Sequence, residues 1–164
     1  MRLPLILTAL SFLLLVSCGT GRRAKAEPTR NHHYKPKPYQ EIVDYARKYI
    51  GTPYKYAGKD PRGFDCSGFT SYVFKAFHKQ LAATAEGQSR QIKEISRDNV
   101  QAGDLVFFKR PGSRKVFHVS LVVSNGREGI VVIHSTTSRG VIVENISQSS
   151  YWKPFLYKTG RFLD

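Results

Sequence analysis

The chain has 164 residues, 41% of them hydrophobic, and its 26 Lys and Arg residues against 12 Asp and Glu residues give a net charge of +14. Beyond the first 38 residues this is enough apolar content for one domain with its own core, and no internal repeat or second domain is visible. The strongly basic balance predicts anionic partners.

Residues 1–17 have the pattern of a secretory signal peptide, in which Arg2 precedes an apolar stretch too short to span a bilayer. The junction Leu15-Val16-Ser17-Cys18 has the form of a bacterial lipobox, where a signal peptidase cuts before the cysteine and the thiol receives a lipid. We therefore predict that lipid on Cys18 tethers the protein to a membrane. An ordinary signal peptide with an incidental cysteine is the alternative.

Residues 18–38 contain the lipidated cysteine and a basic, proline-bearing linker, and residues 39–164 form the predicted domain. Gly19, rather than an aspartate, follows the cysteine, which favours an outer membrane facing the periplasm if the organism has one. A secreted protein rarely meets nucleic acid, so we expect the anionic polymers of the cell envelope as partners and no nucleic acid.

Two helices are predicted at the start of the domain. Apolar residues at helical spacing indicate a helix over Glu41–Ile50, which Gly51 ends. A turn-rich loop over residues 52–63 then leads to a second helix that begins near Cys66. A short third helix is predicted over Gln91–Ile95.

The rest of the domain is predicted to be a sheet. A turn over Gln101–Asp104 leads into Leu105–Phe108, an apolar run that suits a strand buried on both faces. Helices first and an antiparallel sheet second describe an α+β domain. The remaining predicted strands are His118–Ser124, Ile130–Ser135, Val141–Ile146 and Leu156–Phe162, with turns at Asn125-Gly126 and Arg139-Gly140.

Cys66 is the candidate nucleophile. On the first turn of a helix, the free N–H groups and the helix dipole favour a thiolate, so we expect an unusually acidic thiol. If Cys18 carries lipid, Cys66 has no cysteine partner. A buried structural cysteine is the alternative, as is a Cys18–Cys66 disulfide if Cys18 is not lipidated. No metal or other cofactor is expected, because the chain has no Cys-x-x-Cys or His-x-x-x-His pair.

Two histidines lie in the predicted sheet. His118 opens one strand and His134 ends the next, so an antiparallel pairing brings both toward the same end of the sheet. A cysteine nucleophile requires one imidazole to take its proton and a second polar group to orient that imidazole. His78, on the far part of the second helix, is predicted to be a surface residue.

Five short blocks carry a resemblance to a known family. They are, in order, Gly51-Thr52-Pro53-Tyr54-Lys55-Tyr56-Ala57-Gly58, Phe64-Asp65-Cys66-Ser67-Gly68-Phe69, Gly103-Asp104-Leu105-Val106-Phe107-Phe108, His118-Val119-Ser120-Leu121-Val122-Val123 and Val132-Ile133-His134-Ser135. From about Tyr39 onward the chain thus resembles the NlpC family of bacterial cell-wall cysteine peptidases. The resemblance implies a single, papain-like domain.

The resemblance also implies roles for individual residues. Cys66 matches the nucleophile, His118 the general base and then general acid, and His134 the third polar residue. Tyr54 matches a tyrosine beside the nucleophile, whose hydroxyl can stabilise an oxyanion together with the Cys66 N–H.

Asp65 and Ser67 match positions that help to hold the free ammonium of a peptide stem in related enzymes. Two small departures concern loop detail rather than the catalytic set: Ala57 stands where a glycine is common, and Ser120 replaces the usual glycine after the His-Val pair.

The predicted function is a lipid-anchored, monomeric endopeptidase that hydrolyses peptide stems of peptidoglycan. Asp65 and Ser67 favour the bond between γ-D-glutamate and a diamino acid, and the D-alanyl to diamino-acid crosslink stays open. One alternative is a catalytically idle lipoprotein that binds peptidoglycan through the same cleft. Another is an amidase or acyltransferase that uses the same Cys-His pair.

Overall fold

The computed structural model describes residues 38–162. The predicted signal peptide, Cys18 and the linker up to residue 37 lie outside the described residues. Between residues 38 and 162, no helix has the length and apolarity needed to cross a membrane.

Helices precede a six-stranded sheet, which confirms the predicted α+β class. Every neighbouring pair in this sheet is antiparallel, and the strand order is β3-β8-β4-β5-β6-β7. The α-helices are α1 (Pro38–Arg47), α2 (Cys66–Lys75) and α3 (Ala85–Gln88). The strands are β1 (Lys59–Asp60), β2 (Gly63–Phe64), β3 (Ile92–Ile95), β4 (Leu105–Lys109), β5 (Val116–Gly126), β6 (Gly129–Thr136), β7 (Gly140–Asn145) and β8 (Leu156–Phe162).

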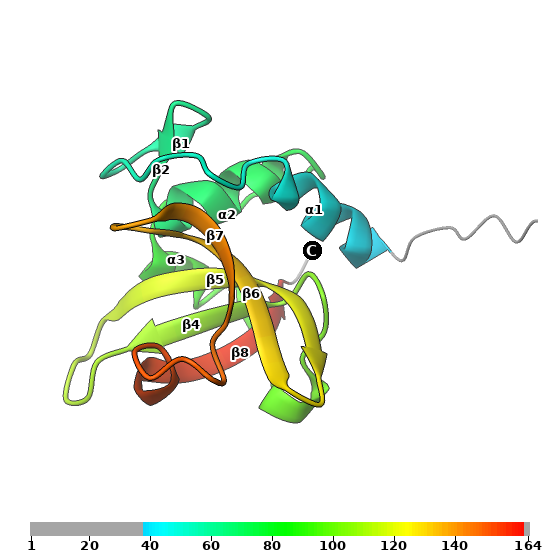
Figure 1. The fold of residues 1–164 in the computed structure, drawn as a ribbon, viewed down its shortest axis with the longest axis vertical. Helices are drawn as coiled ribbons and strands as arrows, with labels where there is room; N and C mark the ends of the chain where they lie inside the picture. The colour runs from blue at the N-terminus through cyan, green and yellow to red at the C-terminus, as the bar shows by residue number, and fades with distance from the viewer. Residues whose placement is uncertain (1–37, 163–164) are drawn as a thin grey trace, which may run out of the picture. The chain divides into compact units, whose positions relative to one another are not determined.

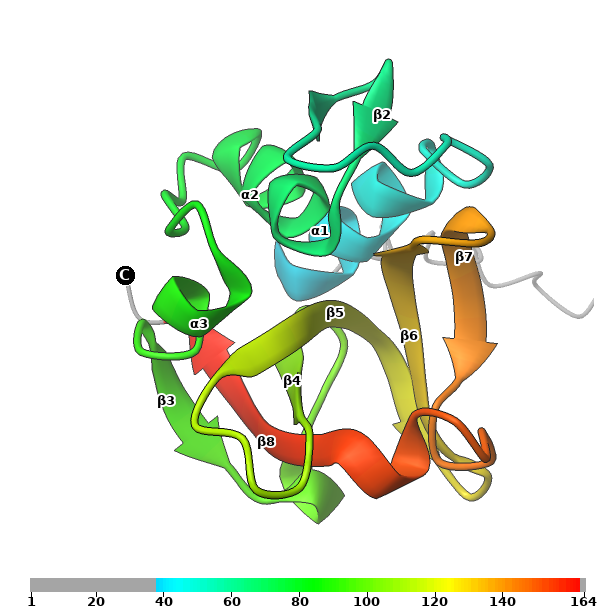
Figure 2. The ribbon, with the colours of Figure 1, turned by 90° about the vertical axis from the view of Figure 1, so that its left-hand side faces the viewer.

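Helices α1 and α2 pack over strands β5 and β6, on one side of the sheet (Figures 1 and 2). Strands β1 and β2 form a separate small hairpin in the loop that leads into α2. The last described strand, β8, lies inside the sheet between β3 and β4, and β3 and β7 are the edge strands (Figure 2). Two 3₁₀ turns complete the fold, at Arg97–Asn99 and Lys153–Phe155.

Strand β4 is buried on both faces, as predicted. Leu105 and Phe107 point into the core between the sheet and the helices, and Val106 and Phe108 point into a second core on the other face. All four side chains are completely buried, and full burial of a side chain of this size contributes roughly 1.5–3 kcal/mol. The sheet is thus anchored from both sides, which gives the strands that carry functional residues a rigid base.

Helix α2 begins with a polar N-cap residue and packs an apolar face against the sheet. The Asp65 carboxylate accepts a hydrogen bond from the Gly68 N–H at 2.6 Å, an N-cap worth about 1 kcal/mol. Phe69 and Val73 are completely buried on the face toward the sheet. A β-carbon at Gly68 would lie 1.9 Å from the carbonyl oxygen of Gly58, so only glycine fits this close approach. These contacts fix the position of the first helical residue, Cys66.

Most predicted elements are present with shifted ends. The first helix ends at Arg47 rather than Ile50, and the Ile50 side chain is 50% exposed. The turn between β5 and β6 consists of residues 127–128, because Gly126 pairs with Gly129 and the strand continues through the predicted Asn125-Gly126 turn. The turn predicted over Gln101–Asp104 is present at residues 102–103. The turn predicted at Arg139-Gly140 lies slightly earlier, at residues 137–139, and Gly140 begins β7.

The predicted helix over Gln91–Ile95 is wrong. Ile92–Ile95 form the edge strand β3, in which Ile92 pairs with Phe162 and Ile95 with Thr159. The helix of this region lies earlier, at Ala85–Gln88, where the Thr84 hydroxyl caps it by accepting from the Gly87 N–H. The free edge of β8 explains the difference, because it offers backbone hydrogen bonds to a segment with β-branched residues at its ends.

Candidate active site

A cleft of about 510 Å³ contains three of the predicted site residues. Tyr54, Cys66 and His118 line it, and they come from the loop before the β1–β2 hairpin, from α2 and from β5. The other side chains at its wall are Arg110, Phe117, Ser135, Thr136, Thr137, Ser138, Arg139, Glu144, Ser149, Tyr151 and Trp152.

The two predicted histidines meet at the cleft wall, where His118 lines the cleft and His134 lies behind it. Strands β5 and β6 pair with Leu121 opposite Ile133, which places His118 and His134 on the same face. The Nε2 atom of His118 lies 2.9 Å from Nδ1 of His134. His134 is completely buried, and Trp152 stacks on the His118 ring at a centroid distance of 4.4 Å. Both imidazoles are therefore held in fixed orientations.

The hydrogen bonds of His134 determine which nitrogens carry protons. Its Nε2 lies 2.7 Å from Oε1 of Glu144, and an ionised carboxylate can only accept. His134 therefore carries its proton on Nε2, and its Nδ1 accepts from the Ser120 hydroxyl at 2.9 Å and from His118 Nε2–H. The unprotonated nitrogen of His118 is then Nδ1, which is free to take a proton.

Glu144 completes this chain of hydrogen bonds. Its Oε1 also accepts from Arg139 and from the indole N–H of Trp152, each at 2.9 Å. These donors, led by His134, lower the pKa of the Glu144 carboxyl to about 2 despite its partial burial. Sequence reasoning missed Glu144; the available signal was a carboxylate inside a strand of β-branched residues.

Cys66 is a neutral thiol in the resting site, so the expectation of an unusually acidic thiol is wrong. Burial raises the pKa of Cys66 to about 11, and the charge of Asp65 adds to this, against the backbone N–H groups of Val119 and Ser67, which favour the thiolate. Burial and the neighbouring His134 lower the pKa of His118 well below its ordinary value of 6.5. Both partners are therefore uncharged near neutral pH.

Tyr54 supplies a hydroxyl to the same cleft. Its side chain is half-buried, and burial, with the charge of Asp65, raises the pKa of the phenol above its usual 10. The hydroxyl therefore keeps its proton and can donate a hydrogen bond. The first hydrogen bond within α2 runs from the Phe69 N–H to the Asp65 carbonyl at 2.9 Å. The Cys66 N–H lies before it in the chain and therefore has no partner within the helix. These two donors are suited to an oxyanion beside the thiol.

Asp65 and Ser67 are not brought into the cleft that Cys66 lines. The Asp65 carboxylate accepts from Ser67 Oγ at 3.0 Å in addition to the Gly68 N–H, and Ser67 Oγ also lies 3.1 Å from the Ala83 carbonyl. Ser67 is buried, and Asp65 is half-buried. In the described structure, their main contribution is to hold the start of α2.

The two departures from the family pattern have clear structural settings. Ala57 has a φ of 54°, a left-handed conformation that glycine adopts without strain, which explains why glycine is common there. Ser120 is completely buried, and its hydroxyl binds His134. The serine therefore adds a hydrogen bond to the histidine pair that glycine lacks. His78 is exposed, as predicted.

Comparisons with known proteins agree with this fold and cleft. The NlpC/P60 family pattern matches residues 51–161. The chain is 37% identical to Gamma-DL-glutamyl hydrolase of Bacillus subtilis (strain 168), over 68% of this chain and 27% of that protein. It is 30% identical to Probable endopeptidase NlpC of Escherichia coli (strain K12), over 98% of this chain and 99% of that protein.

A solved structure supports the same assignment. The crystal structure of the NlpC/p60 domain of peptidoglycan hydrolase SagA is 33% identical, with a TM-score of 0.64, and the match covers 77% of this chain and 100% of that one. The chain thus spans roughly a quarter of the Bacillus subtilis hydrolase and nearly all of the Escherichia coli protein. On the family match, the relatives and the fold together, the chain belongs to the NlpC/P60 family.

Proposed function

We propose that the protein is a monomeric, lipid-anchored cysteine endopeptidase that hydrolyses peptide stems of peptidoglycan. The observation that carries the proposal is the hydrogen-bonded series His118–His134–Glu144, which ends at the cleft that Cys66 lines. This arrangement leaves one nitrogen of His118 free to accept the thiol proton. The names of the relatives, which include hydrolases and endopeptidases, support the same class of reaction.

The chemistry follows from the neutral resting pair. As Sγ of Cys66 attacks the carbonyl carbon of the scissile amide, the thiol proton moves to Nδ1 of His118. The carbonyl electrons move to its oxygen, where the Tyr54 hydroxyl and the Cys66 N–H stabilise the developing charge. His118, now an imidazolium, donates its proton to the leaving amine as the C–N bond breaks, and a thioester remains. Water, deprotonated by His118, then releases the acid and restores the thiol.

Glu144 makes the proton transfer to His118 less costly. The imidazolium donates its Nε2–H to His134, whose own Nε2–H binds the ionised carboxylate. A positive charge on His118 is thereby stabilised through His134 by a negative charge that is already in place. Buried imidazoles without this carboxylate would resist protonation more strongly.

The favoured target is the bond between γ-D-glutamate and a diamino acid, with the D-alanyl crosslink as the second candidate. The Bacillus subtilis relative is named Gamma-DL-glutamyl hydrolase, which supports this choice. Arg110 lines the cleft and supplies positive charge for the free carboxylates of a stem, whereas Arg139 is already paired with Glu144. We further propose that Asp65, which stays half-buried beside the cleft, helps to hold a stem's free ammonium together with Ser67.

Membrane attachment through lipid on Cys18 is part of the proposal, with the outer membrane as destination where one exists. Cys18→Ser should leave the precursor unprocessed by the lipoprotein signal peptidase and should abolish partition of the protein into a detergent phase. Normal processing and partition of that variant would refute the lipid anchor without affecting the peptidase assignment.

The test is digestion of purified sacculi with the full chain, followed by mass spectrometry of the released fragments. We expect fragments with a new γ-D-glutamyl carboxyl end and a new diamino-acid amino end, and none from the Cys66→Ala variant. Release of D-alanyl crosslink products alone would move the cleavage site to the crosslink. Release of reducing sugar alone would exclude a peptidase, and binding without release would favour the idle module.

A further inference from the structure

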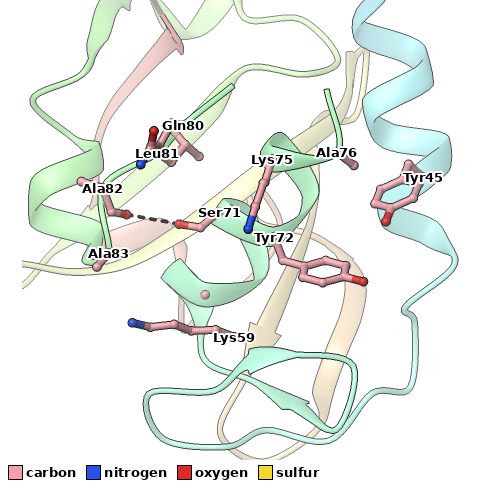
Figure 3. Close-up of a pocket in the computed structure, with 11 residues that line it drawn as sticks. Tyr45, Lys59, Ser71, Tyr72, Lys75, Ala76, Gln80, Leu81, Ala82 and Ala83 are labelled. Atoms are coloured by element: carbon pink, nitrogen blue, oxygen red, sulfur yellow. Dashed lines mark hydrogen bonds between the residues drawn. The ribbon is translucent and has the colours of Figure 1, made fainter. Parts of the chain in front are cut away.

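A second hollow, of about 780 Å³, lies on the outer side of α2. It shares no lining residue with the catalytic cleft. Figure 3 shows its side chains, which come from α1, the β1–β2 hairpin, α2 and the segment that follows α2. The lining residues are Tyr45, Lys59, Gly68, Ser71, Tyr72, Lys75, Ala76, Gln80, Leu81, Ala82 and Ala83.

The hollow is cationic. Lys59 and Lys75 both extend along its wall (Figure 3), and neither ammonium group has an ion pair or hydrogen bond within residues 38–162. No Asp or Glu is among the lining residues. Asp60, next to Lys59, is bound to the Arg62 guanidinium at 2.8 Å. Positive charge therefore accumulates here without a compensating carboxylate.

A smaller hollow of about 480 Å³ continues this surface beyond the end of α2. It shares Ser71, Lys75, Gln80 and Leu81 with the first hollow. It adds His78 and Lys79, and the Lys79 ammonium lies 5.8 Å from the Phe162 ring centre. The two hollows thus form one elongated depression, here called the outer groove, with basic side chains spaced along its length.

The wall of the outer groove is built into the fold. Gln88 is completely buried, and its Nε2 donates to Ser71 Oγ, to the Ala82 carbonyl and to the Ser67 carbonyl at 2.9–3.0 Å. Its Oε1 accepts from the Thr70 hydroxyl at 2.8 Å. Gln88 thereby fixes Ala82 against α2, so this wall of the groove exists before a ligand binds.

Side chains of the same wall can form hydrogen bonds with a ligand in the outer groove. The Ser71 hydroxyl is used within the wall, since it donates to the Ala82 carbonyl at 3.2 Å (Figure 3) and accepts from Gln88 Nε2 at 2.9 Å. Tyr72 contributes a phenol, and Gln80 an exposed amide. An elongated groove with spaced cations and neutral hydrogen-bonding groups fits a long ligand that is both hydroxylated and repeatedly charged.

We propose that the outer groove binds a saccharide chain that carries repeated anionic groups, and that this holds the enzyme on the cell wall while the cleft acts on neighbouring stems. The location in a cell wall rests on the proposed function, but binding in the groove does not. Carboxylated and phosphorylated polymers share the required chemistry.

The test measures affinity of the full chain for three probes of similar length: an oligogalacturonate, a phosphorylated maltodextrin and an unmodified, neutral maltodextrin. The Lys59→Gln/Lys75→Gln double variant should bind the preferred acidic probe about tenfold more weakly, because two exposed ionic contacts are lost. The matched control, Lys93→Gln/Lys115→Gln, removes the same charge from two exposed sites elsewhere and should bind as the unaltered chain does.

Tighter binding of oligogalacturonate than of phosphorylated maltodextrin would assign the groove to carboxylated saccharides, and the reverse order to phosphorylated ones. Salt should weaken binding by the unaltered chain more than by the groove variant. Equal losses in both double variants, or equal binding of the maltodextrin, would overturn the proposal.

A second measurement separates this proposal from the peptidase assignment. The groove variant should hydrolyse a short soluble stem peptide at the unaltered rate but sediment less with sacculi. If the unaltered chain hydrolyses no stem, the proposed function fails, while the probe affinities still decide the groove. If the groove variant sediments with sacculi as well as the unaltered chain, the retention role is refuted.

Discussion

The catalytic cleft and the outer groove lie on different sides of α2, and they differ in whether their polar groups have partners within the protein. Around the cleft, buried polar atoms are paired, and within residues 38–162 no buried side-chain nitrogen or oxygen lacks a partner. In the groove, Lys59 and Lys75 have no anionic partner among the described residues. Paired groups hold the reacting side chains in a fixed geometry, whereas unpaired charges on a rigid wall can attract a ligand of opposite charge. Four predictions test this division, and they are ordered by expected effect.

The largest effect is expected for His118→Ala. Loss of the group that takes and returns the thiol proton should lower kcat on a soluble stem peptide about a thousandfold. Binding of the acidic probe in the groove should not change, which also shows that the variant is folded. A comparable fall in groove affinity would mean that the two sites are not independent.

Tyr54→Phe should lower kcat about a hundredfold, because one donor to the developing oxyanion is removed. Tyr56→Phe is the matched control, since Tyr56 lies in the same loop, is 86% exposed and does not line the cleft. Steady-state kinetics on the stem peptide distinguish the two. If Tyr54→Phe left kcat unchanged, the hydroxyl would have only a packing role.

Glu144→Gln should lower kcat about tenfold, equivalent to about 1.4 kcal/mol of lost transition-state stabilisation. The amide can still accept from His134, but the charge that stabilises the imidazolium is gone. The pKa of His118 should therefore fall further, and the acid limb of the pH–rate profile should move to lower pH. Glu128→Gln, at an exposed carboxylate in the β5–β6 turn, is the control. A lower kcat with an unmoved acid limb would argue for a purely structural role.

The smallest effect is expected from pH itself. Because the pKa of His118 lies well below 6.5, its base form is already complete at pH 6.5, and the Cys66 thiol, with a pKa of about 11, stays protonated. We therefore expect kcat/KM on a stem peptide to be flat from about pH 6.5 to 8, with loss only at lower pH. An inflection near pH 6.5 would show that His118 titrates like a solvated histidine.

Local patterns were sufficient to predict most of the fold. The spacing of Phe69 and Val73 indicates α2, and the apolar run Leu105–Phe108 indicates a doubly buried strand. Strand β3 was not predictable, because Ile92–Ile95 become a strand only by pairing with β8, which lies more than sixty residues later. Its conformation is set by a distant partner rather than by its own sequence.

The site was predictable only in part, for a similar reason. Cys66 and His118 sit in recognisable local patterns, and the structure places both at one cleft. Glu144 acquires its role through the register of β7 on β6, where Ile142 pairs with His134 and Glu144 is two residues further on. The pKa of Cys66 was mispredicted because a position at a helix start says nothing about burial, and burial has the larger effect.

Burial of Cys66 also affects the lifetime of the enzyme. Peroxides oxidise the thiolate rather than the thiol, first to a sulfenic acid and then irreversibly to sulfinic and sulfonic acids. A sulfur whose pKa is raised to about 11 spends almost no time as the thiolate near neutral pH. In the proposed mechanism the proton leaves only when His118 takes it during attack on a substrate, and the resting thiol is therefore protected from oxidation by peroxides.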